Sequence, residues 1–272
     1  MFEHDIDTMF SQGILHKHKN GKYYIKIIDK NILKNKKIQQ IRITEMGKQE
    51  IITKINIINT KFSKMPYYKN YAAVSGTVHN ISKHEDAVKD ILISEGISQF
   101  EPGSELKKKK KKTIIEWIKH PELSSIMPIN SFISQPCGTH ESPDFIVKFS
   151  NDFILAIECK SSNTTAPLYN SGGIHQNYLY VFSSSIPNET VTYMGSDIIT
   201  LEQQKMIDEH IKEARERDEI LNKKLQELDT NHRGVSYYTR PMIGQSGGCE
   251  YTNYFNHKNK ESSGKSILSI DF

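Results

Sequence analysis

Residues 142–160 read SPDFIVKFSNDFILAIECK and contain two apolar segments on either side of a polar turn. Both segments, at 145–149 and 153–157, are rich in β-branched and aromatic residues, which favour strands. Asn151 and Asp152 between them are typical of a tight hairpin. The second segment is continuously apolar, as expected for a strand that is buried on both faces of its sheet. This stretch therefore predicts an antiparallel pair of strands in the core of the fold.

Three charged residues mark the ends of these two segments. Asp144 begins the first strand, and Glu158 and Lys160 lie near the end of the second. Alternate residues of a strand point to the same face, so Glu158 and Lys160 share a face, and the hairpin brings Asp144 beside Glu158. Two close carboxylates repel each other unless a cation lies between them, and hard oxygen ligands select Mg²⁺ or Mn²⁺ over zinc. The alternative is a surface hairpin in which Glu158 and Lys160 form an ordinary salt bridge.

These residues resemble the motif of a known family. Pro143-Asp144 and Glu158-Cys159-Lys160, with thirteen residues between the two acids, are similar to the motif of the PD-(D/E)XK nucleases, and among them to type II restriction endonucleases. The resemblance extends over roughly residues 80–200, including IECKSSN and TAPLYNSGGIHQNYLYVFSS. It implies an α/β fold that is restriction-endonuclease-like, with a central mixed β-sheet flanked by helices.

The same resemblance implies an activity and a role for each motif residue. Asp144 and Glu158 would ligate Mg²⁺, for which Mn²⁺ can substitute, and the backbone carbonyl of Cys159 would complete the metal site. Lys160 would orient or deprotonate the attacking water. The expected reaction is hydrolysis of double-stranded DNA at a short specific sequence, leaving 5′-phosphate and 3′-hydroxyl ends. The expected partners are a second copy of the chain in a homodimer and a DNA methyltransferase that is linked genetically rather than in a stable complex.

Members of the family often have another acid on the preceding helix. Glu85 is the best candidate here, with Asp86 and Asp90 behind it. Glu85 also has the spacing of a capping box with Ser82, so a purely structural role is the alternative.

Other residues are predicted to contact DNA, each with an ordinary loop or strand as the alternative. The candidates directly after the motif can hydrogen-bond phosphates or base edges. The glycine-containing loop near Asn170 allows the backbone to approach DNA closely. Lysine runs neutralise phosphates. Gln176 and Tyr180 have the spacing of a Gln-x-x-x-Tyr pattern found in some nucleases of this group, but here we expect them on a strand rather than a helix. Three polar residues precede the motif, namely Gln135, Thr139 and His140. Gln135 and Thr139 are candidates to line the cleft in which the motif would lie. The predicted DNA contacts are Ser161, Ser162, Asn163, Tyr169, Asn170, Gln176, Lys107, Lys108 and Arg240, with Tyr237, Tyr238 and Lys265 as further candidates.

The rest of the chain gives weaker patterns. Ser82 begins a predicted helix that ends near Glu95, and further elements are a helix at 113–119 and strands at 131–134, 177–183 and 190–195. Ile- and Tyr-rich segments, including EIITKINII at 50–58, predict a β-rich N-terminal extension over residues 1–78, which has the option of contacting DNA, ahead of a nuclease domain over 79–272. The tail at 235–272 predicts short strands.

A long helix is expected after Thr200, which has capping-box spacing with Gln203. Its apolar residues recur with a seven-residue rhythm from Ile207 to Leu228, interrupted by Asp218. Such a stripe packs on the sheet or, alternatively, forms the seam of a coiled-coil dimer.

Composition limits the class of protein only loosely. A net charge of +4 and a pI of about 8.7 are weak indications of nucleic-acid binding. Three cysteines without metal-ligand spacing predict neither a disulfide framework nor a zinc site, and they favour a reducing, cytoplasmic compartment. We expect no signal peptide and no membrane-spanning helix. The alternatives to a restriction enzyme are a structure-selective repair or recombination nuclease (a resolvase or nickase) of the same fold, and a DNA-binding protein that does not cleave.

Overall fold

The computed structural model describes residues 15–17, 23–25, 47–67, 82–103, 110–138, 141–170, 173–245, 253–258, 260 and 267. The chain divides into two compact units, Met1–Ile52 and Thr53–Phe272. In the first unit, β1 (Leu15–Lys17) and β2 (Tyr23–Ile25) form an antiparallel pair. The predicted boundary between residues 78 and 79 and the remaining strands predicted in 26–46 lie outside the described residues.

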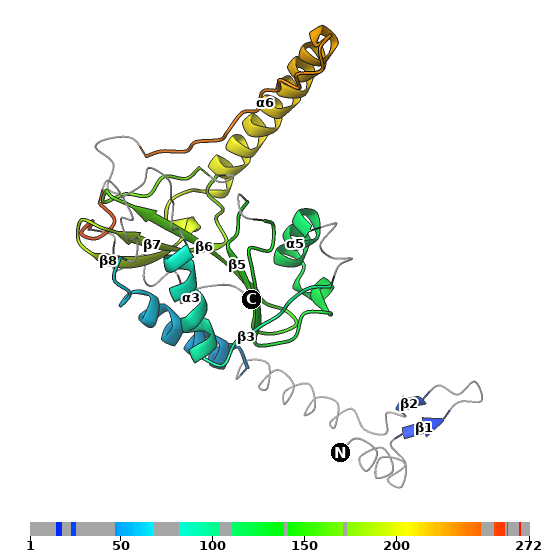
Figure 1. The fold of residues 1–272 in the computed structure, drawn as a ribbon. Coiled ribbons are helices and arrows are strands. Elements are labelled where there is room, and N and C mark those ends of the chain that lie inside the picture. The colour runs from blue at the N-terminus through cyan, green and yellow to red at the C-terminus, as the bar shows by residue number, and fades with distance from the viewer. Residues whose placement is uncertain are drawn as a thin grey trace. The chain divides into compact units, whose positions relative to one another are not determined.

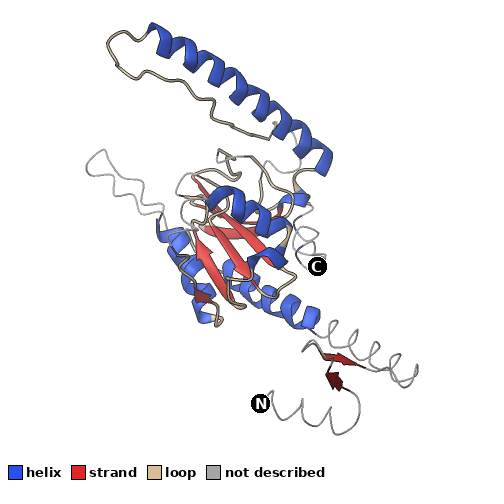
Figure 2. Cartoon of the chain, turned by 90° about the vertical axis from the view of Figure 1, so that its right-hand side faces the viewer, coloured by secondary structure: helices blue, strands red, loops and turns tan. Residues whose placement is uncertain are grey.

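The second unit is built on a mixed sheet of six strands with helices on its two sides (Figures 1 and 2). This confirms the expected α/β architecture with a central mixed sheet flanked by helices. The spatial order follows the chain, and the β3–β4 and β6–β7 pairs are parallel while the other three are antiparallel. The strands are β3 (Ser98–Gln99), β4 (Ser131–Ser134), β5 (Phe145–Lys148), β6 (Ile154–Ser162), β7 (Tyr178–Ser184) and β8 (Glu189–Met194).

The two faces of the sheet are covered by different helices. On one face, Ile114 and Trp117 of α5 (Lys110–Lys119) pack in one cluster with Ile146 and Ile154 of the central hairpin. The helix α3 (Ser82–Ser94) lies over the sheet (Figure 1). The imidazole Nε2 of its His84 lies 3.1 Å from the Val181 carbonyl oxygen. In β6 the residues from Ile154 to Glu158 are all buried, as the continuous apolar pattern at 153–157 predicts for a strand that is covered on both faces.

The strand predicted at 50–58 is wrong. Residues 47–62 form a helix, although 50–58 reads as a strand because of its many isoleucines. The buried positions are Ile55, Ile58 and Phe62, so the apolar period is three to four residues rather than two. Ile57, which would share a face with the buried Ile55 in a strand, is 45% exposed on the other side of the helix.

The long helix α6 (Leu201–Leu228) begins at the predicted capping box. The Thr200 hydroxyl accepts from the backbone N–H of Gln203, and the Gln203 side chain accepts from the N–H of Thr200. The helix is described over its whole length and none of its residues is buried, so the stripe is not covered along its length by the sheet.

The chain after α6 returns along this helix. Both the N–H and the carbonyl oxygen of Tyr237 bond the Asn222 side chain, and Thr239 donates through its N–H and its hydroxyl to the carboxylate of Asp218. Asp218 therefore interrupts the apolar rhythm because it binds the returning segment. The strand predicted over 235–240 is wrong, since these residues run beside a helix and have no strand partner among the described residues.

No helix in the described part of the chain has the length and the apolar character needed to cross a membrane.

Replacing Thr200 by Ala is expected to lower the free energy of unfolding by about 1 kcal/mol, because the first turn of α6 loses its side-chain cap. Amide hydrogen exchange should show the loss as faster exchange confined to the first turns of α6. An unchanged exchange rate at Gln203 would contradict this role of the cap.

Candidate active site

The site is formed at the start of β5, where the neighbouring strand β6 extends beyond the end of their pairing. The β5–β6 register ends at Phe145 opposite Ile157, and one further step places Asp144 opposite Glu158. Beyond that point β6 pairs only with β7, which leaves the β5 side of Cys159 open. The Cys159 N–H donates to Asp144 Oδ2 at 2.7 Å. Because the N–H and C=O of one strand residue face the same side, the Cys159 carbonyl also points toward the side of Asp144.

Glu158 and Lys160 point to the same face, as their two-residue spacing predicts. The Lys160 ammonium donates to Glu158 Oε1 at 2.7 Å, and both side chains are buried. The second oxygen, Glu158 Oε2, accepts from the hydroxyl of Ser142 at 2.9 Å. A buried ion pair with a further hydrogen bond at the end of an apolar strand is unlike the exposed salt bridge of the alternative interpretation.

A third carboxylate reaches the same place from α3. Glu85 Oε2 accepts from the side-chain amide of Gln135 at 3.1 Å. The backbone N–H of Gln135 donates to the Asp144 carbonyl oxygen at 2.6 Å, so this residue joins α3 to the start of β5. The structure thus places Glu85 near the motif, while the side chain of its alternative partner, Ser82, lies outside what is described.

The electrostatics of this group are dominated by excess negative charge. Burial raises the pKa of Asp144 well above its usual value, and the neighbouring carboxylates of Glu158 and Glu85 raise it further. The Cys159 N–H and the Lys160 ammonium act in the opposite direction. The pKa of Glu85 is also raised, first by burial and then by Glu158. Three carboxylates therefore share one ammonium in a poorly hydrated place.

These donors fit a hard divalent cation. Mg²⁺ is usually held by one or two carboxylates together with waters and substrate phosphates, rather than by a full protein cage. Among the described residues no three His, Cys, Asp or Glu side chains converge as a ready-made metal cluster. Asp144, Glu158 and the Cys159 carbonyl would supply the protein ligands, and the unbalanced negative charge is the observation that favours a cation here.

In the absence of metal, folding stability should depend on the charge of Asp144. An acid whose pKa is raised in the folded state destabilises that state once it ionises, because its charge is less favourable there than in the unfolded chain. This free-energy cost begins when the pH rises above 3.8, the usual pKa of an aspartate, and grows until the pH passes the pKa of Asp144 in the folded state. With EDTA present, the gain in unfolding free energy of Asp144→Asn over wild type should therefore rise with pH in urea titrations. A difference that shrinks as pH rises would contradict the raised pKa.

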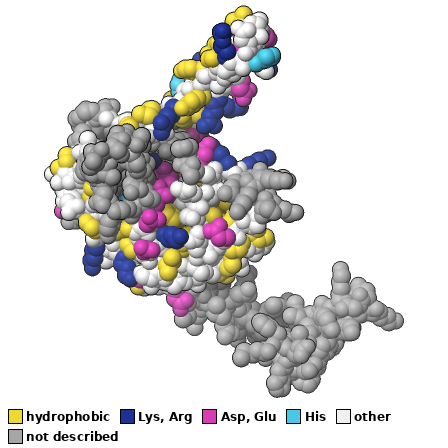
Figure 3. Space-filling view, in the orientation of Figure 1, with side chains coloured by type: hydrophobic (Ala, Val, Ile, Leu, Met, Phe, Trp, Pro, Cys, Tyr) yellow, Lys and Arg dark blue, Asp and Glu magenta, His cyan; other side chains and the backbone are white. Residues whose placement is uncertain are grey.

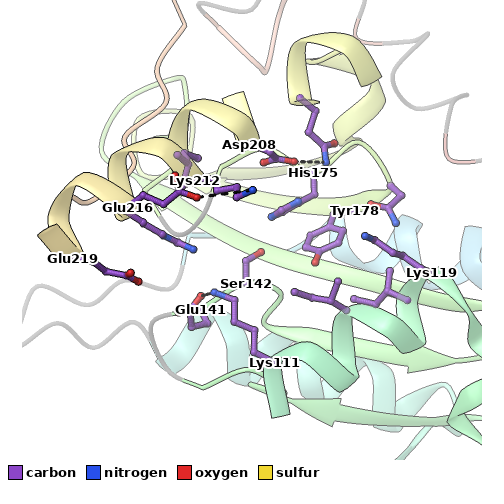
Figure 4. Close-up of a pocket in the computed structure, with 16 residues that line it drawn as sticks. Lys111, Lys119, Glu141, Ser142, His175, Tyr178, Asp208, Lys212, Glu216 and Glu219 are labelled. Atoms are coloured by element: carbon purple, nitrogen blue, oxygen red, sulfur yellow. Dashed lines mark hydrogen bonds and ion pairs between the residues drawn. The ribbon is translucent and has the colours of Figure 1, made fainter. Parts of the chain in front are cut away.

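A cleft of about 630 Å³ opens beside the motif (Figure 4). Ser142, the partner of Glu158, lines the cleft, and so does Tyr178 of β7. The His175 ring lies 4.5 Å from the Tyr178 ring, and the pKa of His175 is lowered mainly by burial. The walls of the cleft come from α5 and α6, two helices that the sequence did not predict to be neighbours.

The structure separates the predicted DNA contacts into different groups. Ser161, Ser162 and Asn163 lie at the open end of β6, where Asn163 Oδ1 accepts from the Tyr67 hydroxyl at 2.9 Å. Arg240 donates to the carbonyl oxygen of Asn170 at 3.4 Å, so these two candidates are neighbours.

Two of these predictions need correction. Tyr169 is fully buried, and its hydroxyl bonds those of Tyr193 and Tyr254, so it belongs to the core rather than to a DNA-facing loop. Gln176 lies in a turn before β7 instead of on a strand, and Tyr180 is buried within β7. The Gln-x-x-x-Tyr pattern therefore has no helical counterpart here. Lys107, Lys108, Thr139, His140 and Lys265 lie outside the described residues.

Sequence reasoning missed Ser142, and it proposed Gln135 only as a residue that lines a cleft. Ser142 directly precedes Pro143, and its two-residue distance from Asp144 was the only available signal. Gln135 has a positive φ of 44° at the end of β4, a conformation that the sequence did not predict.

No model of a protein family, no curated protein and no solved structure matches this chain.

Proposed function

We propose that this chain is a Mg²⁺-dependent DNA endonuclease of the PD-(D/E)XK type, acting as a type II restriction enzyme on double-stranded DNA. The observation that supports this best is the meeting of Asp144, Glu158 and Lys160 at the rim of the sheet. The resemblance of the motif points to the same chemistry, and the mixed sheet flanked by helices is compatible with a restriction-endonuclease-like fold.

Each residue of the site has a role in the proposal. Asp144 and Glu158 hold the cation through carboxylate oxygens, and the Cys159 carbonyl faces the same place. When bound, the cation supplies an acidified water and neutralises charge that develops on the phosphate. Lys160 positions that water and stabilises the scissile phosphate. Ser142 and Gln135 fix the carboxylates of Glu158 and Glu85 by hydrogen bonds.

The proposal extends to a homodimer, because cutting both strands of a duplex most simply uses two equivalent centres. Sedimentation velocity of the purified chain with and without DNA tests this part. The surface of α6 that the returning segment leaves exposed, including Ile220 and Leu228, is available for a coiled-coil seam.

Incubation of supercoiled plasmid with the purified protein and Mg²⁺ tests the function. Discrete fragments from a plasmid of known sequence support a restriction enzyme. Preference for branched over linear duplex would support a structure-selective nuclease instead, and binding without cutting in Mg²⁺ and in Mn²⁺ would contradict the nuclease proposal.

A further inference from the structure

The two walls of the cleft beside the motif differ in charge. The α5 wall presents Lys111 and Lys119 with Ile115 and Ile118 between them, and no acid of α5 lines the cleft. The α6 wall mixes both signs, since its lining includes Asp208, Lys212, Arg215, Glu216 and Glu219. Lys and Arg side chains gather around the lower part of α6 in the space-filling view (Figure 3). A backbone of uniform negative charge is therefore matched best by the α5 wall.

Two residues that line the cleft, Ser142 and Tyr178, connect it to Glu158 of the motif. Lys111 and Lys119 are eight residues apart on one helix, about 12 Å along its axis, so they can contact two different phosphates of one strand. Ser142 at the floor donates to Glu158 Oε2, and the Tyr178 hydroxyl is close enough to Glu158 to be influenced by its charge. A strand lying along α5 would thus pass beside Ser142, the hydrogen-bond partner of Glu158.

One acid occupies this wall. The Lys111 ammonium forms a hydrogen-bonded ion pair with Glu141 Oε2, and Figure 4 shows the two side chains meeting at the cleft. The side chains are 43% and 41% exposed, so the pair is partly hydrated and contributes little net stability. A carboxylate and a phosphate accept the same charge-assisted hydrogen bonds from an ammonium.

We propose that the α5 wall of this cleft binds the phosphate backbone of DNA through Lys111 and Lys119, and that Glu141 occupies a phosphate position on Lys111 until DNA binds. The proposal rests on the proposed function and names the surface that positions the strand for cutting. Phosphate contacts of this kind position a duplex without reading its sequence.

Fluorescence anisotropy with a labelled duplex of mixed sequence tests this surface in EDTA, where no cutting occurs. Lys111→Ala and Lys119→Ala should each reduce the slope of log affinity against log salt concentration by about 0.9. Glu141→Gln should tighten binding roughly two- to fivefold, because the competing charge is removed. This tightening should vanish in the Lys111→Ala background.

The chain offers a matched control in the ion pair of Lys61 with Glu95, which joins the helix at 47–62 to the turn after α3. Lys61→Ala and Glu95→Gln change charge equally and should leave both affinity and slope unchanged. The proposal is overturned if the Lys111 and Lys119 variants keep the wild-type slope, or if Glu141→Gln tightens binding equally without Lys111. Cleavage of plasmid by the wild-type protein is measured separately, so these outcomes are distinct from failure of the nuclease proposal.

Discussion

Replacing Asp144 by Asn is expected to lower Mg²⁺-dependent DNA cleavage by about a thousandfold or more, or ~4 kcal/mol in transition-state stabilisation. Asparagine keeps the shape of the side chain and an oxygen that can accept from the Cys159 N–H, but it removes the charge that would hold the cation. The variant should also unfold at a higher urea concentration than wild type in EDTA, because it removes a buried charge and, with it, repulsion from Glu158 and Glu85. Loss of activity with a gain in stability separates a catalytic carboxylate from a structural one.

The control for this variant is Asp152→Asn, an exposed acid in the turn of the same β5–β6 hairpin. It should retain wild-type cleavage. DNA binding of Asp144→Asn in EDTA should equal or exceed that of wild type, and cleavage at the wild-type rate would remove Asp144 from the reaction.

Replacing Lys160 by Gln is expected to lower cleavage roughly a hundredfold while metal binding persists, since the loss of one positioned proton-transfer group or cation costs about this much. The ammonium now neutralises one oxygen of Glu158 at 2.7 Å. Without it, Glu158 gains attraction for a divalent cation, so Mn²⁺ affinity measured by calorimetry should be equal or tighter. Asp144→Asn should show the opposite pattern, with metal binding lost.

Lys64→Gln provides the matched control for this change, because Lys64 is an exposed lysine in the turn after the helix at 47–62. It should leave cleavage and Mn²⁺ affinity unchanged. Equal loss of cleavage and metal binding in Lys160→Gln would mean that Lys160 supports the fold of the site rather than the reaction.

The parts of the fold that sequence predicted are those with a strong local period. The β5–β6 hairpin, β7, β8 and α3 were expected near their observed bounds, because long apolar runs, turn residues and caps agree there. The capping box of Thr200 was correct in both of its hydrogen bonds. These features depend only on residues close in sequence.

The misses depend on contacts between distant segments or on composition. The helix at 47–62 was mistaken for a strand because abundant isoleucine outweighed a three-to-four residue period. The packing of the 235–240 segment on α6 follows from bonds of Tyr237 and Thr239 to residues at least fifteen positions away. Tyr169 was placed on a loop surface because its burial depends on Tyr193 and Tyr254.

The same limit applies to the candidate site: contacts between residues close in sequence were predicted, and contacts with distant segments were not. Two-residue spacing correctly placed Glu158 and Lys160 together, and the hairpin brought Asp144 next to them. Ser142 and Gln135 could not be assigned because their roles depend on where Glu158 and Glu85 lie in space. The walls of the cleft were not foreseen, since they belong to helices about ninety residues apart in the chain.

The most direct test of the central claim is anomalous diffraction from crystals soaked in Mn²⁺. We predict one strong peak within about 2.3 Å of a carboxylate oxygen of Asp144, with Glu158 and the Cys159 carbonyl oxygen as the other protein ligands. The same soak of Asp144→Asn should give no peak there. A peak elsewhere in the wild type, with these carboxylates free of metal, would contradict the account.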